Sequence, residues 1–216
     1  TDQENTPEEL DWSKFDTAIV SPGVRPDSAL LQAAQRSGLE IISELEYGAR
    51  HFKGVMLAVT GTNGKTTTVE LCTHLLKALY RQGAVSEAGN IGLPLSTLAA
   101  DPEAPALAVV EVSSFQLEYA PQFAPAAAVI LNIASDHLDR YHNSMEEYAR
   151  VKYSIFRHVP PGDRITMHGL SGGAAPRFTC DAEGWICYRG DRLFRQAGTH
   201  LMGEHNLENL LAALEL

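Results

Sequence analysis

The chain has 216 residues, of which 44% are hydrophobic and 20% are charged, and its formal net charge is −10. This length allows one large domain or a domain with part of another, and the negative charge argues against a nucleic-acid partner, which would require a basic stripe. With three cysteines and no apolar run of about 18 residues, the sequence predicts no disulfide framework and no membrane partner, and we expect a cytoplasmic protein.

The first 52 residues alternate between strand and helix patterns. We expect a strand at 17–20 that ends in Ser21-Pro22-Gly23, a helix from a Ser28 N-cap to Arg36, a strand at 39–42 and a helix at 43–52. Two strands do not make a complete sheet. Residues 1–52 are therefore predicted to be the C-terminal part of a domain whose first half precedes this chain.

From residue 53 onward the alternation is more regular, and residues 53–216 are predicted to form a second domain. Its strands are expected at 55–60, 106–111 and 127–132, and its helices at 65–80, 145–156 and 206–216. Apolar strands separated by helices indicate a mostly parallel sheet covered on both faces, so the predicted fold class is α/β. Cys72 is expected in the core, and the segment 189–192 is expected to join two strands of a hairpin.

The segment from Thr60 to Thr68 is the most informative stretch of the chain. An apolar strand leads into Gly61 and Gly64, which let the backbone approach an anion closely, and Lys65 and Thr66 then open a helix. Backbone N–H groups, a helix N-terminus and an ammonium around one point predict a phosphate site, with the Thr66 hydroxyl as a Mg²⁺ ligand. The glycines are closer together than in the common P-loop, and a solvated turn is the alternative.

Polar side chains also follow the next two predicted strands. Glu111 ends one of them, and a carboxylate one strand away from the phosphate loop is either a Mg²⁺ ligand or a solvated acid. After the other strand comes His137, which is a metal ligand through its neutral imidazole or a structural or surface histidine. Asp136 and Asp139 beside it have the same open alternatives: metal ligand, helix cap or solvated side chain.

Two further positions lie on predicted helices. Lys152, on the helix 145–156, is by its local sequence an ordinary helical lysine. Asn206 and Asn209 are spaced three residues apart on the last helix, so their amides can hydrogen-bond the edge of a base. Asn206 is also a good N-cap, which is the alternative for that residue.

Taken in chain order, the motifs resemble those of the Mur ligases, which add amino acids to the cytoplasmic peptidoglycan precursor. The matching stretches are Thr-Gly-Thr-Asn-Gly-Lys-Thr-Thr (60–67), Gly-Asn-Ile-Gly (89–92), Glu-Val-Ser-Ser-Phe-Gln-Leu-Glu (111–118), Asp-His-Leu-Asp-Arg (136–140), Tyr-x-x-x-Lys (148–152) and His-Asn-x-x-Asn (205–209). Within this family, the Ser-Ser-Phe-Gln-Leu-Glu run and Ser-Pro-Gly-Val (21–24) are most similar to the branch that adds D-glutamate to UDP-N-acetylmuramoyl-L-alanine.

The resemblance implies a role for each matching residue. ATP would be bound by Thr62, Asn63, Gly64, Lys65, Thr66 and Thr67 at its phosphates, and by Asn206 and Asn209 at its adenine. Two Mg²⁺ sites are implied, one held by Thr66 and Glu111 and the other by His137 and a carbamoylated Lys152. A carbamate would turn the lysine cation into an oxygen ligand of the kind that Mg²⁺ prefers. The muramoyl substrate would contact Ser21, Gly23, Asn90, Ser113, Gln116 and His137, and the catalytic set would be Lys65, Glu111, His137 and Lys152.

The implied reaction is ATP-dependent ligation through an acyl phosphate. The alanine carboxylate attacks the γ-phosphate of ATP, and the amine of D-glutamate then attacks the acyl phosphate. The resemblance also implies a third domain that this chain lacks, so we expect the fragment alone to be inactive and the full-length protein to be a monomer. Two alternatives stay open: a sister Mur or folylpolyglutamate-type ligase that uses another amino acid, and a non-catalytic nucleotide-binding module.

Overall fold

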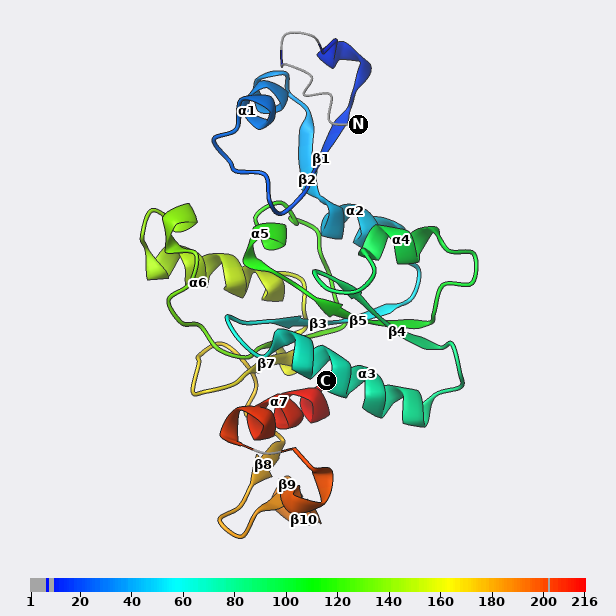
Figure 1. Cartoon of the computed structure of the whole chain (residues 1–216), viewed down its shortest axis with the longest axis vertical. Helices are drawn as coiled ribbons and strands as arrows, with labels where there is room; N and C mark the ends of the chain where they lie inside the picture. Colours follow the sequence, from blue (N-terminus) through cyan, green and yellow to red (C-terminus); the bar gives the residue numbers. More distant parts are fainter. Residues whose placement is uncertain (1–6, 8–9, 202) are drawn as a thin grey trace.

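The computed structural model describes residue 7, residues 10–201 and residues 203–216. The start of the predicted first domain, at residues 1–6, 8 and 9, lies outside the described residues. Figure 1 shows three parts along the long axis of the molecule: a small unit that contains β1, β2 and α1, a central sheet between helices, and a small antiparallel sheet.

Five parallel strands form the central sheet, in the spatial order β4-β5-β3-β6-β7. They are β3 (Val55–Thr60), β4 (Val85–Gly89), β5 (Leu107–Glu111), β6 (Ala127–Ile130) and β7 (Arg164–Thr166). The prediction of a mostly parallel α/β sheet is confirmed, with β3 at its centre. Strand β4 was not predicted, because it is an edge strand in which the polar Ser86 and Glu87 interrupt the apolar pattern.

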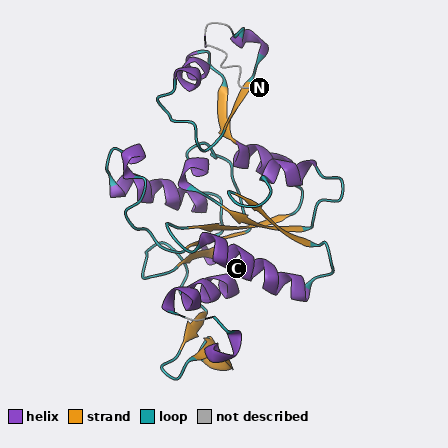
Figure 2. Ribbon diagram, in the orientation of Figure 1, coloured by secondary structure: helices purple, strands orange, loops and turns teal. Residues whose placement is uncertain are grey.

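Helices cover both faces of this sheet (Figures 1 and 2). One face carries α3 (Lys65–Leu79) and α7 (Glu204–Glu215), and the other carries α2 (Glu44–His51), α4 (Leu95–Ala100), α5 (Ser114–Leu117) and α6 (Met145–Tyr153). Side chains of β3 alternate between two cores, since Val59 packs with Val69 and Cys72 while Ala58 packs with Leu95. The predicted core position of Cys72 is confirmed.

The small N-terminal unit consists of β1 (Thr17–Val20), β2 (Glu40–Ser43) and α1 (Ala29–Arg36), with a 3₁₀ turn at Trp12–Lys14 before them. The two strands are parallel. Ser28 caps α1 as predicted, accepting a hydrogen bond from the Leu31 amide. Strand β2 begins one residue later than expected, because the Leu39 amide is engaged with the Ala34 carbonyl at the end of α1.

Helix α2 connects this unit to the central sheet. Leu45 and Phe52 at its two ends are buried in the core on the α4 side of the sheet. The buried carboxylate of Glu46 accepts hydrogen bonds from Arg50 Nε at 2.8 Å and from the Gln122 amide at 3.1 Å. The helix therefore packs against the sheet, although it lies within the residues assigned by sequence to the first domain. The boundary at residues 52 and 53 stays a prediction.

Gly48 allows α2 and α4 to pack backbone against backbone. A Cβ added at this position would lie 2.6 Å from the Ser96 amide nitrogen and 2.7 Å from the Leu95 carbonyl carbon. Replacing a helical glycine by alanine normally stabilises a protein by about 1 kcal/mol. Here we expect Gly48→Ala to destabilise the chain by about 1–3 kcal/mol, because a backbone neighbour cannot move away without shifting α4.

Urea denaturation of Gly48→Ala checks this expectation. Gly162→Ala is the control, since a Cβ there meets nothing within 4 Å, and its stability should stay close to that of the parent chain. A stabilised Gly48→Ala variant would contradict the packing of α2 on α4.

The antiparallel sheet has the order β10-β9-β8 and contains β8 (Phe178–Cys180), β9 (Trp185–Tyr188) and β10 (Asp191–Arg195). The predicted hairpin is confirmed, but its turn is shorter, because Asp191 already pairs with Tyr188. The two turn residues, Arg189 and Gly190, both have positive φ angles, as the twist of a two-residue hairpin requires. Strand β8, which pairs with β9, was not predicted.

Candidate functional site

The loop between β3 and α3 surrounds the ammonium group of Lys65. Lys65 Nζ donates to the carbonyl oxygens of Gly61 and Thr62, at 3.0 and 2.9 Å. Gly64 is the N-cap of α3 and has a φ of 84°, and a side chain there would collide with Asn209 Oδ1 on α7. The loop thus places a cation and a helix N-terminus together, which is the arrangement that binds an anion.

Asn132, just beyond β6, fixes the backbone of this loop. Its Oδ1 accepts from the amides of Thr62 and Asn63, at 3.1 and 2.9 Å, and its Nδ2 donates to the Asn63 carbonyl at 3.1 Å. That Asn132 supports the phosphate loop was not predicted from the sequence. The available signal was its position, as the first polar residue after the apolar strand that pairs with β3.

Glu111 lies at the end of β5, the other strand that pairs with β3. Its carboxylate accepts from Thr66 Oγ1 at 2.8 Å and from Asn90 Nδ2 at 3.0 Å. The residue is 3% exposed, which excludes the alternative of a solvated acid. A carboxylate and a hydroxyl are hard oxygen donors that suit Mg²⁺. Within the described part of the chain, no three His, Cys, Asp or Glu side chains gather as a metal site. The Thr66–Glu111 pair therefore fits a Mg²⁺ ion that takes further ligands from phosphates and water.

A cavity of about 260 Å³ lies beside this pair and is lined by several of the predicted site residues. Residues that line it include Lys65, Asn90, Ser113, Asp136, His137 and Lys152. The sequence elements that supply them are far apart in the chain but converge at the carboxyl ends of β3, β4, β5 and β6. This is the edge where parallel sheets of this type bind ligands.

Lys152 reaches this cavity from α6 and is not an ordinary surface lysine. It is 2% exposed, and its Nζ donates to the Gly61 carbonyl at 2.8 Å and lies 4.8 Å from the centre of the Tyr148 ring. Burial, together with the charge of Lys65, lowers the pKa of Lys152 to about 7. A substantial fraction of this amine is therefore neutral at neutral pH, and the neutral amine is the form that reacts with CO₂.

Tyr148, on the same helix, fixes α6 to the phosphate loop. Its hydroxyl lies 3.2 Å from Thr62 Oγ1, which also accepts from the Ala134 amide at 3.0 Å. Burial raises the pKa of the Tyr148 hydroxyl, so it stays neutral. From the sequence, Tyr148 was predicted only as the first residue of the Tyr-x-x-x-Lys motif. Its contact with the loop spans 86 residues of sequence and has no local signal.

A second cavity of about 480 Å³ separates the N-terminal unit from the central one. Gly23 and Arg25 line one side, and Phe115 and Arg140 line the other. His137 and Phe115 line both this cavity and the smaller one, so the two cavities adjoin at these residues. The His137 backbone has a left-handed φ of 48°, and its Nε2 lies 3.5 Å from Asp136 Oδ2. Asp136 thus pairs with His137 in this structure.

A third cavity, of about 340 Å³, lies between the phosphate loop and α7. Asn63, Gly64, Thr67 and Asn209 are among its lining residues. Asn209 Oδ1 accepts from Thr68 Oγ1 at 3.3 Å. Asn206 lies one turn earlier on α7 and does not line this cavity.

The N-cap of α7 is Gly203, so the alternative that Asn206 caps the helix is wrong. The helix starts at Glu204, two residues before the expected position, and Asn206 lies inside its first turn.

Ser113 and Gln116 form a capping box at the start of α5. Gln116 Oε1 accepts from the amide and the hydroxyl of Ser113, each at 3.0 Å. Ser113 lines the smaller cavity, whereas Gln116 is 2% exposed and contacts Ser113 instead. Gln116 therefore orients the residue that faces the cavity. That either residue contacts a substrate stays a prediction.

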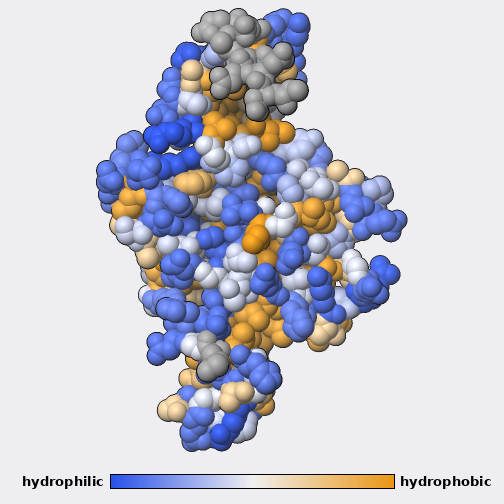
Figure 3. Space-filling model, in the orientation of Figure 1, coloured by the Kyte–Doolittle hydropathy of each residue, from blue (hydrophilic) through white to orange (hydrophobic). Residues whose placement is uncertain are grey.

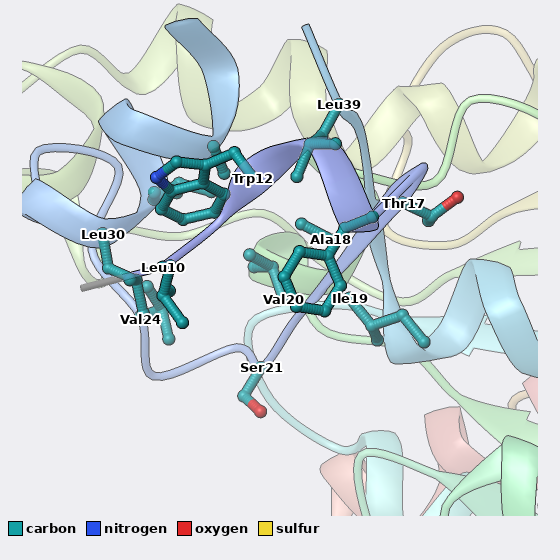
Figure 4. Close-up of a pocket in the computed structure, with 13 residues that line it drawn as sticks. Leu10, Trp12, Thr17, Ala18, Ile19, Val20, Ser21, Val24, Leu30 and Leu39 are labelled. Atoms are coloured by element: carbon teal, nitrogen blue, oxygen red, sulfur yellow. The ribbon is translucent and has the colours of Figure 1, made fainter. Parts of the chain in front are cut away.

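An apolar pocket of about 310 Å³ lies in the N-terminal unit, away from these groups. Figure 3 shows apolar side chains gathered in this part of the molecule, and Figure 4 shows Trp12, Leu30 and Leu39 around the pocket. Ser21 lies at the end of β1, with its hydroxyl directed away from them (Figure 4). The described residues that line this pocket carry no charge, unlike those that line the cavities at the edge of the central sheet.

Comparison with known proteins identifies the family. The model for the Mur ligase middle domain matches residues 59–168, which contain the phosphate loop, Glu111, His137 and Lys152. The chain belongs to the Mur ligase family. Two similar curated proteins are both named UDP-N-acetylmuramoylalanine–D-glutamate ligase. The one from Acidobacterium capsulatum is 39% identical over 95% of this chain and 49% of its own length, and the one from Salinibacter ruber is 41% identical over 97% and 51%.

Solved Mur ligases have the same fold. The UDP-N-acetylmuramate–alanine ligase MurC from Thermotoga maritima superposes with a TM-score of 0.56 at 24% identity, covering 92% of this chain and 50% of that one. The MurF ligase from the same organism, solved in complex with ADP, superposes with a TM-score of 0.52 at 20% identity over 95% of this chain and 61% of that one. The chain spans about half the length of the curated relatives that it matches.

Within the described ranges, no helix is both long enough and apolar enough to span a bilayer.

Proposed function

We propose that this chain is the nucleotide-binding part of a cytoplasmic ligase that joins D-glutamate to UDP-N-acetylmuramoyl-L-alanine with ATP. The relatives that carry this name match nearly the whole chain. The observation that carries the proposal is the cavity in which Lys65, Asn90, His137 and Lys152 meet next to the Thr66–Glu111 pair. His137 connects this cavity to the larger one between the two units, so a nucleotide-linked acceptor in the larger cavity would extend its carboxylate toward ATP.

Each residue of the site has a separate task under this proposal. The loop amides and Lys65 bind the β- and γ-phosphates, and Asn132 keeps those amides in place. When bound at Thr66 and Glu111, Mg²⁺ would neutralise phosphate charge and so allow a carboxylate to approach. Lys65 adds a positive charge at the transferring phosphoryl group. Asn209 and Asn206, both on α7, are proposed to bind the adenine of ATP.

Carbamoylation of Lys152 is part of the proposal. The amine has to be neutral to react with CO₂, and its burial favours that form. The cavity beside Nζ has room for the added group, and His137 lines the same cavity. We propose that the carbamate and His137 hold a second Mg²⁺. A carbon-13 NMR signal of a lysine carbamate after incubation with labelled bicarbonate, absent in Lys152→Met, would support this, and no such signal would refute it.

The domain division at residues 52 and 53 and the need for further chain are also proposals. A partner domain that binds D-glutamate and closes over ATP would explain why the relatives are about twice as long. We propose that the 216-residue chain alone does not complete ligation and that the full-length enzyme acts as a monomer.

Phosphate release by the full-length protein tests the proposed function. The protein is supplied with ATP, Mg²⁺, UDP-N-acetylmuramoyl-L-alanine and one amino acid at a time. We expect release with D-glutamate and none with L-lysine, diaminopimelate or L-glutamate. Release with another amino acid would assign the chain to a sister ligase. No release with any of them would refute catalysis and leave a nucleotide-binding module.

A further inference from the structure

The guanidinium group of Arg140 joins three segments that border the larger cavity. Its Nε and Nη2 donate to the Glu118 carboxylate, at 2.9 and 2.8 Å, just after α5. Its Nη1 donates to the Pro22 carbonyl at 3.2 Å, in the loop that leaves β1. Its Cζ lies 4.3 Å above the Phe115 ring. Arg140, a side chain of the central unit, therefore binds the backbone of the N-terminal unit at Pro22.

This contact is shielded from water, unlike the Arg25–Asp27 ion pair at the same cavity. The side chains of Arg140 and Glu118 are 9% and 14% exposed, whereas those of Arg25 and Asp27 are 65% and 67% exposed. An exposed pair contributes little to a structure, while a shielded bidentate pair holds a defined geometry. All three guanidinium nitrogens donate a hydrogen bond, two to Glu118 and one to Pro22. These bonds fix the side chain between the two segments, so we assign its effect on a ligand in the cavity to the groups that it holds.

Arg140 also belongs to the turn that positions His137. The 3₁₀ turn Leu138–Tyr141 lies between His137 and His142, whose φ angles are 48° and 52°. The Arg140 amide donates to the His137 carbonyl at 3.1 Å. Left-handed backbone at residues other than glycine is strained and persists only where surrounding contacts fix it. The backbone amide of residue 140 is such a contact, and Arg140→Lys keeps it.

We propose that Arg140 is a positioning residue that holds the loop 21–24 at a set distance from the wall formed by Phe115 and His137. This distance sets the width of the larger cavity, in which the proposed nucleotide-sugar acceptor lies. The inference rests on the proposed function and adds to it: Arg140 controls binding of the acceptor while leaving the ATP side of the site unchanged. Lysine cannot replace it, since a single ammonium cannot engage both oxygens of Glu118 and reach Pro22.

Steady-state kinetics of the full-length protein test this role. Arg140→Lys keeps the charge and removes the fork of donors, so it should raise KM for the acceptor about tenfold while kcat and KM for ATP stay within about twofold. Arg150→Lys is the matched control, because Arg150 is an exposed arginine on α6, and it should change none of these three kinetic constants. An unchanged acceptor KM in Arg140→Lys would overturn the proposal. So would a fall in kcat alone, which would indicate loss of folded enzyme.

Hydrogen exchange provides a readout that needs no substrate. The Val24 amide donates to the Ser21 carbonyl at 3.0 Å within the held loop. We expect it to exchange at least about tenfold faster in Arg140→Lys than in the parent protein, because the loop opens more often without its anchor. Equal exchange in both would overturn the anchoring. If the parent protein released no phosphate with any amino acid, the proposed function would fail, and this measurement would still decide whether Arg140 anchors the loop.

Discussion

Lys152→Met is expected to make the chain more stable and the full-length enzyme inactive. At pH 6 we expect a gain of about 1–4 kcal/mol in the free energy of unfolding, since methionine fills a similar volume without a buried charge. The Gly61 carbonyl keeps a donor in the variant, because Lys65 Nζ also donates to it at 3.0 Å. Ligation should fall by about 10³-fold or more, as expected when a proposed metal ligand is removed.

The gain in stability should depend on pH in a defined direction. The pKa of Lys152 is lowered from 10.5 to about 7 by folding, so between these values the unfolded chain binds more protons than the folded one. Stability of the parent chain therefore rises with pH across this window. The cost of burying the charge is complete below pH 7 and absent above about pH 10.5. The advantage of Lys152→Met should thus be largest at pH 6 and smaller at pH 9.

Urea denaturation in CO₂-free buffer at these two pH values measures the effect. Lys53→Met is the control, because Lys53 is exposed, and its stability should match the parent at both values. A Lys152→Met variant that is less stable at pH 6, or whose advantage grows with pH, would show that the buried charge is compensated in the folded chain.

Gly64→Ala is expected to weaken both the fold and the binding of ATP. A non-glycine residue at a φ of 84° costs about 1–2 kcal/mol. The added Cβ would also collide with Asn209 Oδ1 and displace it from Thr68. We expect a total loss of about 3 kcal/mol and a fall in ATP affinity of about 100-fold, because the loop amides and the N-terminus of α3 shift together. Urea denaturation and calorimetric titration of the full-length protein with ATP measure the two effects.

Two variants separate the backbone cost from the collision. Gly83 has a φ of 79° and open space around its Cβ position, so Gly83→Ala should lose only the backbone share, about 1 kcal/mol. Adding Asn209→Ala to Gly64→Ala removes the colliding atom and should recover part of the stability. If Gly83→Ala and Gly64→Ala lowered the free energy of unfolding by the same amount, the predicted collision with Asn209 would be contradicted.

Much of the fold could be predicted because the buried strands carry continuous apolar runs. Strand β3 has the predicted bounds, since Gly54 and Gly61 flank the apolar run 55–59 and Thr60. Prediction failed where tertiary contacts replace local pattern. Edge strand β4 tolerates Ser86 and Glu87 because it has a partner on one side alone. The predicted helix 145–156 changes to a 3₁₀ turn after Tyr153, a change that no residue type there signals.

The site was predictable to the extent that its residues occur in compact motifs. Glu111 ends an apolar strand, and Lys65 and Thr66 follow another strand after a short loop. Parallel strands bring such positions to one edge of the sheet. Lys152 had no local signal, because its helix is mostly polar and burial depends on the distant Gly61 carbonyl. The supporting function of Asn132 could not be predicted for the same reason, since its partners lie about 70 residues earlier in the chain.

The packing of α7 against α3 also has a consequence for the order in which the protein is made. Val69 and Cys72 of α3 share a core with Ala212 and Ala213 of α7. During synthesis the phosphate loop emerges from the ribosome long before α7, because the chain is made from its N-terminus. Until residue 209 has emerged, the Thr68 hydroxyl lacks Asn209 as its acceptor, and α3 covers this face of the sheet without α7. The loop therefore gains the shape proposed to bind ATP late in synthesis, and a nascent chain that stops before α7 exposes apolar surface for chaperones to bind.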